Sequence, residues 1–120
     1  MAGSGAAGTK PLTSSVFYIL LALADEDRHG LGIVEEVDRR TGGEVQLGPG
    51  TLYNAVKKML VAGLIDEPTK RPAPELDDPR RRYYRITRRG RAAVEVEAAR
   101  LQRVVDAARD KDLLSASRGR

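Results

Sequence analysis

The sequence is poor in the residues that carry most enzyme chemistry. Its 120 residues include no Cys and a single His, His29. Without cysteine there is no disulfide framework and no thiolate metal site, and one histidine cannot build a multi-histidine zinc site. The sequence also lacks a nucleophile–base pair, a Gly-rich phosphate loop following a strand and a cluster of ligating residues. We therefore expect a protein that is not an enzyme and that uses no cofactor or metal.

Aromatic residues and long apolar runs are also scarce. One Phe, four Tyr and no Trp leave the core to Leu, Val, Ile and Ala, which favours packed helices and invites dimerisation. The longest apolar run, residues 16–24, is much shorter than the roughly eighteen residues of a membrane helix. Residues 1–10 lack the basic start and apolar stretch of a signal peptide. These features predict one domain with a cytoplasmic location.

Positive charge is concentrated in one short stretch. Residues 68–91 carry nine Lys or Arg against three acidic residues, whereas residues 1–67 carry six against nine. Prolines at positions 68, 72, 74 and 79 mark the same stretch as an exposed loop. An exposed basic loop is a candidate phosphate binder, although a solvated linker would have the same composition.

The spacing of apolar residues predicts four helices and a hairpin. Helices are expected at about 13–24, 29–41 and 49–63, and a last one after Thr87, which can cap it. Residues 64–67 and 82–87 are predicted strands on either side of the basic loop. The order α-α-α-β-β-α predicts a mainly α fold with a small β-hairpin, the winged helix-turn-helix, followed by a C-terminal helix.

The predicted organisation has four parts. Residues 12–88 form the winged helix-turn-helix DNA-binding domain, and residues 89–114 form a C-terminal dimerisation helix. Residues 1–11 and 115–120 are expected to be disordered tails, because small and polar residues cannot offset the entropy lost on ordering.

Four short sequence pieces follow the order and spacing of a known family. They are His29-Gly30, PGTLY at 49–53, Gly63-Leu64-Ile65 and YYRITRRG at 83–90. From residue 12 to about 114, the chain resembles the PadR family of bacterial transcriptional regulators, and within it the smaller members with a single dimerisation helix. PGTLY alone would be a weak match, whereas four ordered pieces are specific. The resemblance implies DNA binding, and repression rather than activation.

Two positions depart from the family pattern. Family members often have Ser where this chain has Gly48, so glycine replaces the side-chain cap at a cost of a few tenths of a kcal/mol. The family often has an aromatic residue at the position of Leu31, and some drug-binding members stack planar ligands against a Trp. Because this sequence has no Trp, that ligand mechanism cannot be carried over.

The candidate DNA-reading helix has a polar face opposite its apolar stripe. Asn54 could pair with adenine, and Lys57 or Lys58 could meet guanine or phosphate. Free backbone N–H groups at the start of this helix suit an anion. The lysines could equally be solvated, and Tyr53 could be half-buried packing. The candidate DNA-binding residues of this helix are Pro49, Gly50, Thr51, Tyr53, Asn54, Lys57 and Lys58.

The basic loop supplies the wing of the predicted fold. Lys70, Arg71, Arg80, Arg81 and Arg82 are expected at or beside its tip, where they would contact phosphates and set affinity more than sequence preference.

Two further basic features lie outside the wing. In the first turn of the last helix, Arg88, Arg89 and Arg91 oppose the helix dipole, so we expect them to face DNA or to pair with acidic residues across a dimer. His29 is interpreted as a structural residue, packed or capping, at the start of the second helix.

The last helix carries an apolar stripe at spacings of three and four residues, which implies a helical partner. We predict a homodimer formed through this stripe and the first helix, with recognition helices about 34 Å apart and an inverted-repeat site in double-stranded DNA. The predicted dimerisation residues are Phe17, Tyr18, Val94, Ala98, Leu101, Val105 and Ala108.

The sequence thus favours a homodimeric repressor, and we expect any small-molecule effector that relieves repression to bind at the dimer interface. The alternative is a winged-helix protein-interaction module without specific DNA reading, which should have an acidic or apolar wing and helix face.

Overall fold

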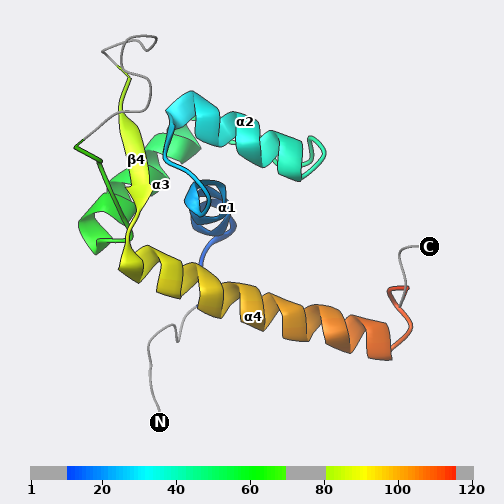
Figure 1. Cartoon of the computed structure of the whole chain (residues 1–120). Helices are drawn as coiled ribbons and strands as arrows, with labels where there is room; N and C mark the ends of the chain where they lie inside the picture. The colour runs from blue at the N-terminus through cyan, green and yellow to red at the C-terminus, as the bar shows by residue number, and fades with distance from the viewer. Residues whose placement is uncertain (1–10, 70–80, 116–120) are drawn as a thin grey trace.

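The described part of the chain folds into four helices and a small antiparallel sheet (Figure 1). The computed structural model describes residues 11–69 and 81–115. The elements in chain order are α1 (Ser14–Leu23), β2 (Arg28–His29), α2 (Gly30–Arg40), α3 (Pro49–Ala62), β3 (Ile65–Asp66), β4 (Tyr83–Ile86) and α4 (Arg88–Asp110). The predicted mainly α fold with a small β component is confirmed, and it is that of a winged helix-turn-helix.

The helix starts are fixed by local capping. The Thr13 side chain accepts a hydrogen bond from the Val16 N–H at 3.2 Å, and the Thr87 hydroxyl accepts one from the Gly90 N–H at 3.0 Å. Gly48 caps α3 without a side-chain bond, and Pro49 occupies the first turn, where a missing N–H costs nothing. The positions of the hydroxyl residues and of the Gly-Pro pair in the sequence therefore correctly predict where these helices begin.

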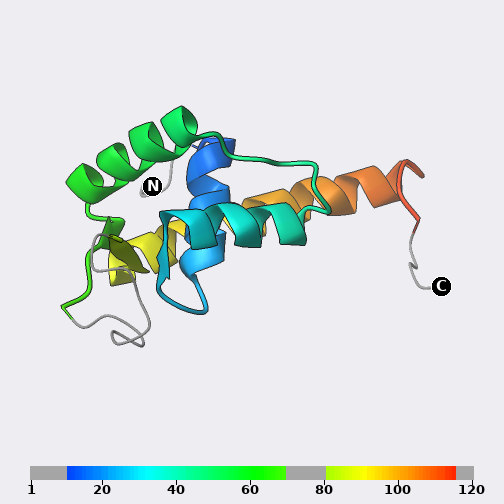
Figure 2. The same ribbon diagram turned by 90° about the horizontal axis from the view of Figure 1, so that it is seen from above.

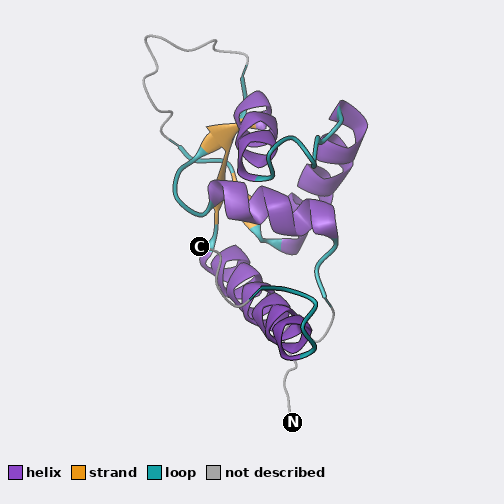
Figure 3. Ribbon diagram, turned by 90° about the vertical axis from the view of Figure 1, so that its right-hand side faces the viewer, coloured by secondary structure: helices purple, strands orange, loops and turns teal. Residues whose placement is uncertain are grey.

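Among the described residues the sheet has three strands rather than the predicted two. β4 is central in the order β2-β4-β3, with Arg28 opposite Tyr84 on one side and Ile65 opposite Ile86 on the other. Figure 3 shows this sheet at one edge of the helical cluster. The short β2 was missed because two residues are too few to show the alternation that marks a strand.

The core is built around α1. This helix contacts α2, α3 and α4, and Figure 2 shows it crossing between them. Its Ile19, Leu20 and Leu23 are fully buried, as are Ile33 of α2 and Met59 of α3. Aliphatic residues and Met therefore fill the centre, as the shortage of aromatic residues predicted.

A close contact joins the end of α3 to the start of α4. Gly63 ends α3 with a φ of 77°, which favours glycine, and its carbonyl accepts a 2.6 Å hydrogen bond from the Thr87 hydroxyl. Gly90 packs so closely that a Cβ there would overlap the Leu64 carbonyl. Thr87 and Gly90 of the YYRITRRG stretch are therefore structural residues at this junction.

Helix α4 extends past the other helices in both Figure 1 and Figure 2. Its 23 residues span about 35 Å at 1.5 Å per residue. No helix in the described part of the chain is both long and apolar enough to cross a membrane. Of the two predicted tails, residues 1–10 and 116–120 lie outside the described residues.

Candidate nucleic-acid interface

Helix α3 separates an apolar face from a polar one. Ala55, Val56 and Met59 are buried against the core. The opposite face is exposed. Tyr53 on this face is 60% exposed, so its side chain is not packed in the core. All seven residues predicted on this helix are exposed: Pro49, Gly50, Thr51, Tyr53, Asn54, Lys57 and Lys58. This face offers two ammonium groups, an amide and hydroxyls to a ligand.

The first turn of α3 is also open. No side chain caps it, and a Cβ at Gly48 or Gly50 would meet nothing within 4 Å. A large surface can therefore approach the backbone N–H groups of this turn, which carry the positive end of the helix dipole.

Two arginines lie just before strand β4, beside α3. Arg82 pairs with Glu67 and lies over the Tyr84 ring, with its guanidinium carbon 6.0 Å from the ring centre. Arg81 and Arg82 border the same hollow as Pro49 and Tyr53, so the start of β4 and the start of α3 share one surface. Lys70, Arg71 and Arg80 lie outside the described residues.

His29 has the structural role predicted for it. Its Nδ1 accepts a 3.1 Å hydrogen bond from the Gly32 N–H and so caps α2. Its ring packs edge-on to Tyr83 with centres 5.2 Å apart, and its Nε2 lies 3.3 Å from Nη1 of Arg81. His29 thereby fixes the start of α2 against β4.

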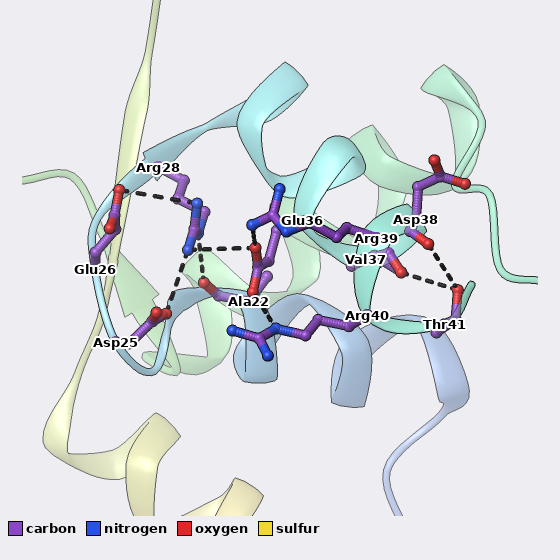
Figure 4. Close-up of polar contacts among 10 residues, drawn as sticks. All are labelled: Ala22, Asp25, Glu26, Arg28, Glu36, Val37, Asp38, Arg39, Arg40 and Thr41. Atoms are coloured by element: carbon purple, nitrogen blue, oxygen red, sulfur yellow. Dashed lines mark hydrogen bonds and ion pairs between the residues drawn. The ribbon is translucent and has the colours of Figure 1, made fainter. Parts of the chain in front are cut away.

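A buried carboxylate, which the sequence reading missed, fixes α2 against α1 (Figure 4). Glu36 is 3% exposed and pairs with Arg39, with Arg40 at 2.8 Å and with Arg28 at 3.6 Å. The Arg40 hydrogen bond lowers the pKa of Glu36, burial opposes it, and Arg28 and Arg39 lower it further. Arg28 also donates to the Ala22 carbonyl of α1 at 2.8 Å.

One of the three arginines at the start of α4 makes a contact within its own domain. Arg91 donates a 2.7 Å hydrogen bond to the Ala24 carbonyl, the C-cap residue of α1. A cation at this position opposes the dipole of α4, but the end of α1 supplies a carbonyl that compensates for it. Arg88 and Arg89 are exposed.

The predicted dimerisation stripe divides along α4. Val94 is 6% exposed and belongs to the core of its own domain. Ala98 and Val105 are exposed, whereas Leu101 and Ala108 are half-buried. On α1, Phe17 and Tyr18 are half-buried with their rings 5.9 Å apart in an edge-on contact.

Several solved structures share this architecture, among them structures of transcriptional regulators. A transcriptional regulator from Clostridium thermocellum matches with a TM-score of 0.66 and 21% identity, covering 82% of this chain and 96% of that one. A PadR family transcription regulator from Clostridium difficile R20291 matches with a TM-score of 0.65 and 24% identity, covering 82% and 97%. RosR from H. salinarum matches with a TM-score of 0.58 and 26% identity, covering 86% and 96%.

Comparison with curated proteins gave no match. The model of the transcriptional regulator PadR-like family, however, matches residues 19–96, which is more than half of the chain and runs from α1 into α4. It includes the four sequence pieces and the exposed face of α3. The chain therefore belongs to the PadR-like family of transcriptional regulators.

Proposed function

We propose that this chain is a homodimeric repressor that binds an inverted-repeat operator in double-stranded DNA. The observation that carries the proposal is the shared surface of α3 and β4. There the exposed Thr51, Asn54, Lys57 and Lys58 lie on the helix whose first turn adjoins Arg81 and Arg82. Such a surface can read base edges with the helix and hold the backbone with the arginines.

The dimer is proposed from the exposed part of α4. Val104 and Val105 remain 55% and 36% exposed on a helix that extends past its own domain. Pairing of this segment with a second copy would hold two α3 helices for successive major grooves, roughly 34 Å apart. A small-molecule effector that relieves repression is part of the same proposal.

Selection from a random duplex library at near-physiological salt tests the proposal. We expect enrichment of an inverted repeat with half-sites about one helical turn apart, bound roughly a thousandfold more tightly than scrambled DNA. A library without enrichment would contradict sequence-specific reading and favour the protein-interaction alternative.

Substitutions separate base reading from backbone binding. Asn54→Ala or Lys57→Ala should weaken operator binding by about 1–3 kcal/mol if the side chain reads a base. Arg81→Ala and Arg82→Ala should weaken operator and scrambled DNA alike and reduce the salt dependence. Lys111→Ala, at the far end of α4, is the matched control and should change neither. If Asn54→Ala and Lys57→Ala weaken binding to the operator and to scrambled DNA equally, α3 does not read bases.

A further inference from the structure

Two ion pairs join the end of β3 to β4, and they lie on opposite faces of the sheet. Asp66 pairs with Arg85 at 3.0 Å, and Glu67 pairs with Arg82. Asp66 and Glu67 are consecutive residues of an extended segment, so their side chains point to opposite faces. All four side chains are between 44% and 58% exposed, so neither pair is a core contact. The two pairs have the same chemistry and differ in what lies beside them.

The Glu67–Arg82 pair lies at the candidate nucleic-acid interface. Arg82 borders the hollow between α2, α3 and β4, together with Leu31, Tyr53 and Tyr84. Its guanidinium carbon is 6.0 Å from the centre of the Tyr84 ring. The Glu67 hydrogen bond raises the pKa of Arg82, and the phenols of Tyr84 and Tyr53 raise it further. Glu67 therefore places a carboxylate beside an arginine that the proposed function assigns to the DNA backbone.

A DNA phosphate and the Glu67 carboxylate are alternative partners for Arg82. Both are oxyanions that a guanidinium binds through parallel N–H donors. A phosphate that approaches Arg82 is also repelled by the negative charge of Glu67. An exposed ion pair contributes little to stability, so Arg82 can change partner without unfolding the sheet. The free energy of this exchange reduces the affinity for any DNA, whatever its sequence.

We propose that Glu67 is an intramolecular competitor of DNA, which holds Arg82 in the unbound protein and releases it to a backbone phosphate on binding. Glu67 is thus a positioning residue that acts through Arg82. It lowers the affinity for operator and other DNA alike, because the exchange involves no base. Sequence preference stays with α3, whereas Glu67 sets the absolute affinity and the time that the protein stays on DNA. This inference rests on the proposed backbone contact of Arg82, but not on recognition of an operator.

The first test is the affinity of Glu67→Gln for a scrambled duplex at fixed salt. Glutamine has a similar shape and still accepts a hydrogen bond from Arg82, but it carries no charge. We expect binding about fivefold tighter than that of the unaltered chain, which is the affinity equivalent of one exposed ion pair. Damage to the fold cannot imitate this result, because it would weaken DNA binding. Unchanged or weaker binding would overturn the proposal.

Asp66→Asn is the matched control. It removes the same charge from the neighbouring residue and also deprives an arginine of its partner, but on the opposite face of the sheet. Added net positive charge by itself would tighten DNA binding in both variants. We expect Asp66→Asn to change the affinity less than about twofold, because salt screens exposed charges that lie away from the contact. Equal tightening by the two substitutions would make net charge the cause and overturn competition for Arg82.

A double-mutant cycle tests whether Glu67 acts through Arg82. A chain with Arg82→Gln has no guanidinium to compete for, so adding Glu67→Gln should change its DNA affinity less than about twofold. A gain of about fivefold in that background would mean that Glu67 repels DNA directly, which would overturn the proposal.

The salt dependence of DNA binding gives a second readout. It should be the same for the unaltered chain and Glu67→Gln, because both neutralise the same phosphates. A steeper salt dependence in Glu67→Gln would mean that Arg82 reaches no phosphate in the unaltered chain. That result would contradict the exchange of partners.

The last measurement repeats the titrations on the duplex recovered by selection. Glu67→Gln should tighten operator binding by the same factor as binding to scrambled DNA. A changed ratio of the two affinities would give Glu67 a part in sequence preference and overturn the proposal. If binding to scrambled DNA tightens and no operator is recovered, the competition stands and the proposed sequence reading fails. If an operator is recovered and Glu67→Gln does not tighten binding, the sequence reading stands and the competition fails.

Discussion

The two halves of α4 carry similar amphipathic sequence but differ in what covers their apolar residues. In the first half, Gly90 packs on Leu64, Val94 joins the core and Glu97 holds the Leu12 backbone. In the second half, from Ala98 to Asp110, no residue is buried, and Val104 and Val105 face solvent. A periodic apolar stripe thus predicts which residues of a helix need cover. It does not predict whether their own domain covers them.

The largest effect is expected at Gly90, in the covered half. Gly90→Ala would place a methyl group on the Leu64 carbonyl, which is backbone and cannot rotate away. We expect a loss of about 3 kcal/mol or more in unfolding free energy, measured by urea denaturation. Gly50→Ala is the control, since a Cβ there meets nothing within 4 Å and alanine favours a helix. Equal stability of the two variants would contradict the close packing.

The next pair of substitutions compares the halves directly. Val94→Ala should lower stability by about 2 kcal/mol at every protein concentration, because it opens a gap inside one domain. Leu101→Glu should leave the domain folded but shift sedimentation towards the monomer, because it places a charge in the proposed dimer contact. A variant that still sediments as a dimer would move the interface away from this stripe.

The smallest effect is expected in the dependence of stability on acidic pH. The Arg100 hydrogen bond lowers the pKa of Glu97 below its usual value of 4.5, burial opposes it, and the Leu12 N–H lowers it further. A lowered folded pKa gives stability that is complete above pH 4.5 and lost as pH falls through the folded value. Unfolding free energy should therefore decline below about pH 4.5, and Glu97→Gln should flatten that decline.

The matched substitution in the uncovered half is Asp106→Asn. Asp106 pairs with Arg109 at 3.5 Å and is 58% exposed, so solvent screens the pair. Its pH profile should follow that of the unaltered chain. A profile as flat as that of Glu97→Gln would mean that burial does not distinguish the halves.

Much of the fold could be predicted because its boundaries are encoded locally. Thr13, Pro49 and Thr87 lie where caps and first-turn residues belong, and helices α1, α3 and α4 each start within about one residue of them. The face of α3 was also predictable, since helical periodicity separates Val56 and Met59 from Asn54 and Lys57.

The remaining features depend on contacts between distant segments. Glu36 has the sequence signature of a solvated acid, but its side chain is buried, and it pairs with Arg28 of β2 as well as with two arginines of its own helix. Arg91 meets Ala24 across 67 positions of the chain. The hollow beside Leu31 has no sequence signal either, because three elements separated along the chain form its walls.

The central position of β4 also bears on self-association through strands. Both of its sides are already paired, and the outer strands β2 and β3 have only two residues each. Edges this short offer too few free backbone groups to template another strand. Sequence changes in the described part of the sheet can therefore alter the surface that meets a ligand without creating an edge that drives aggregation.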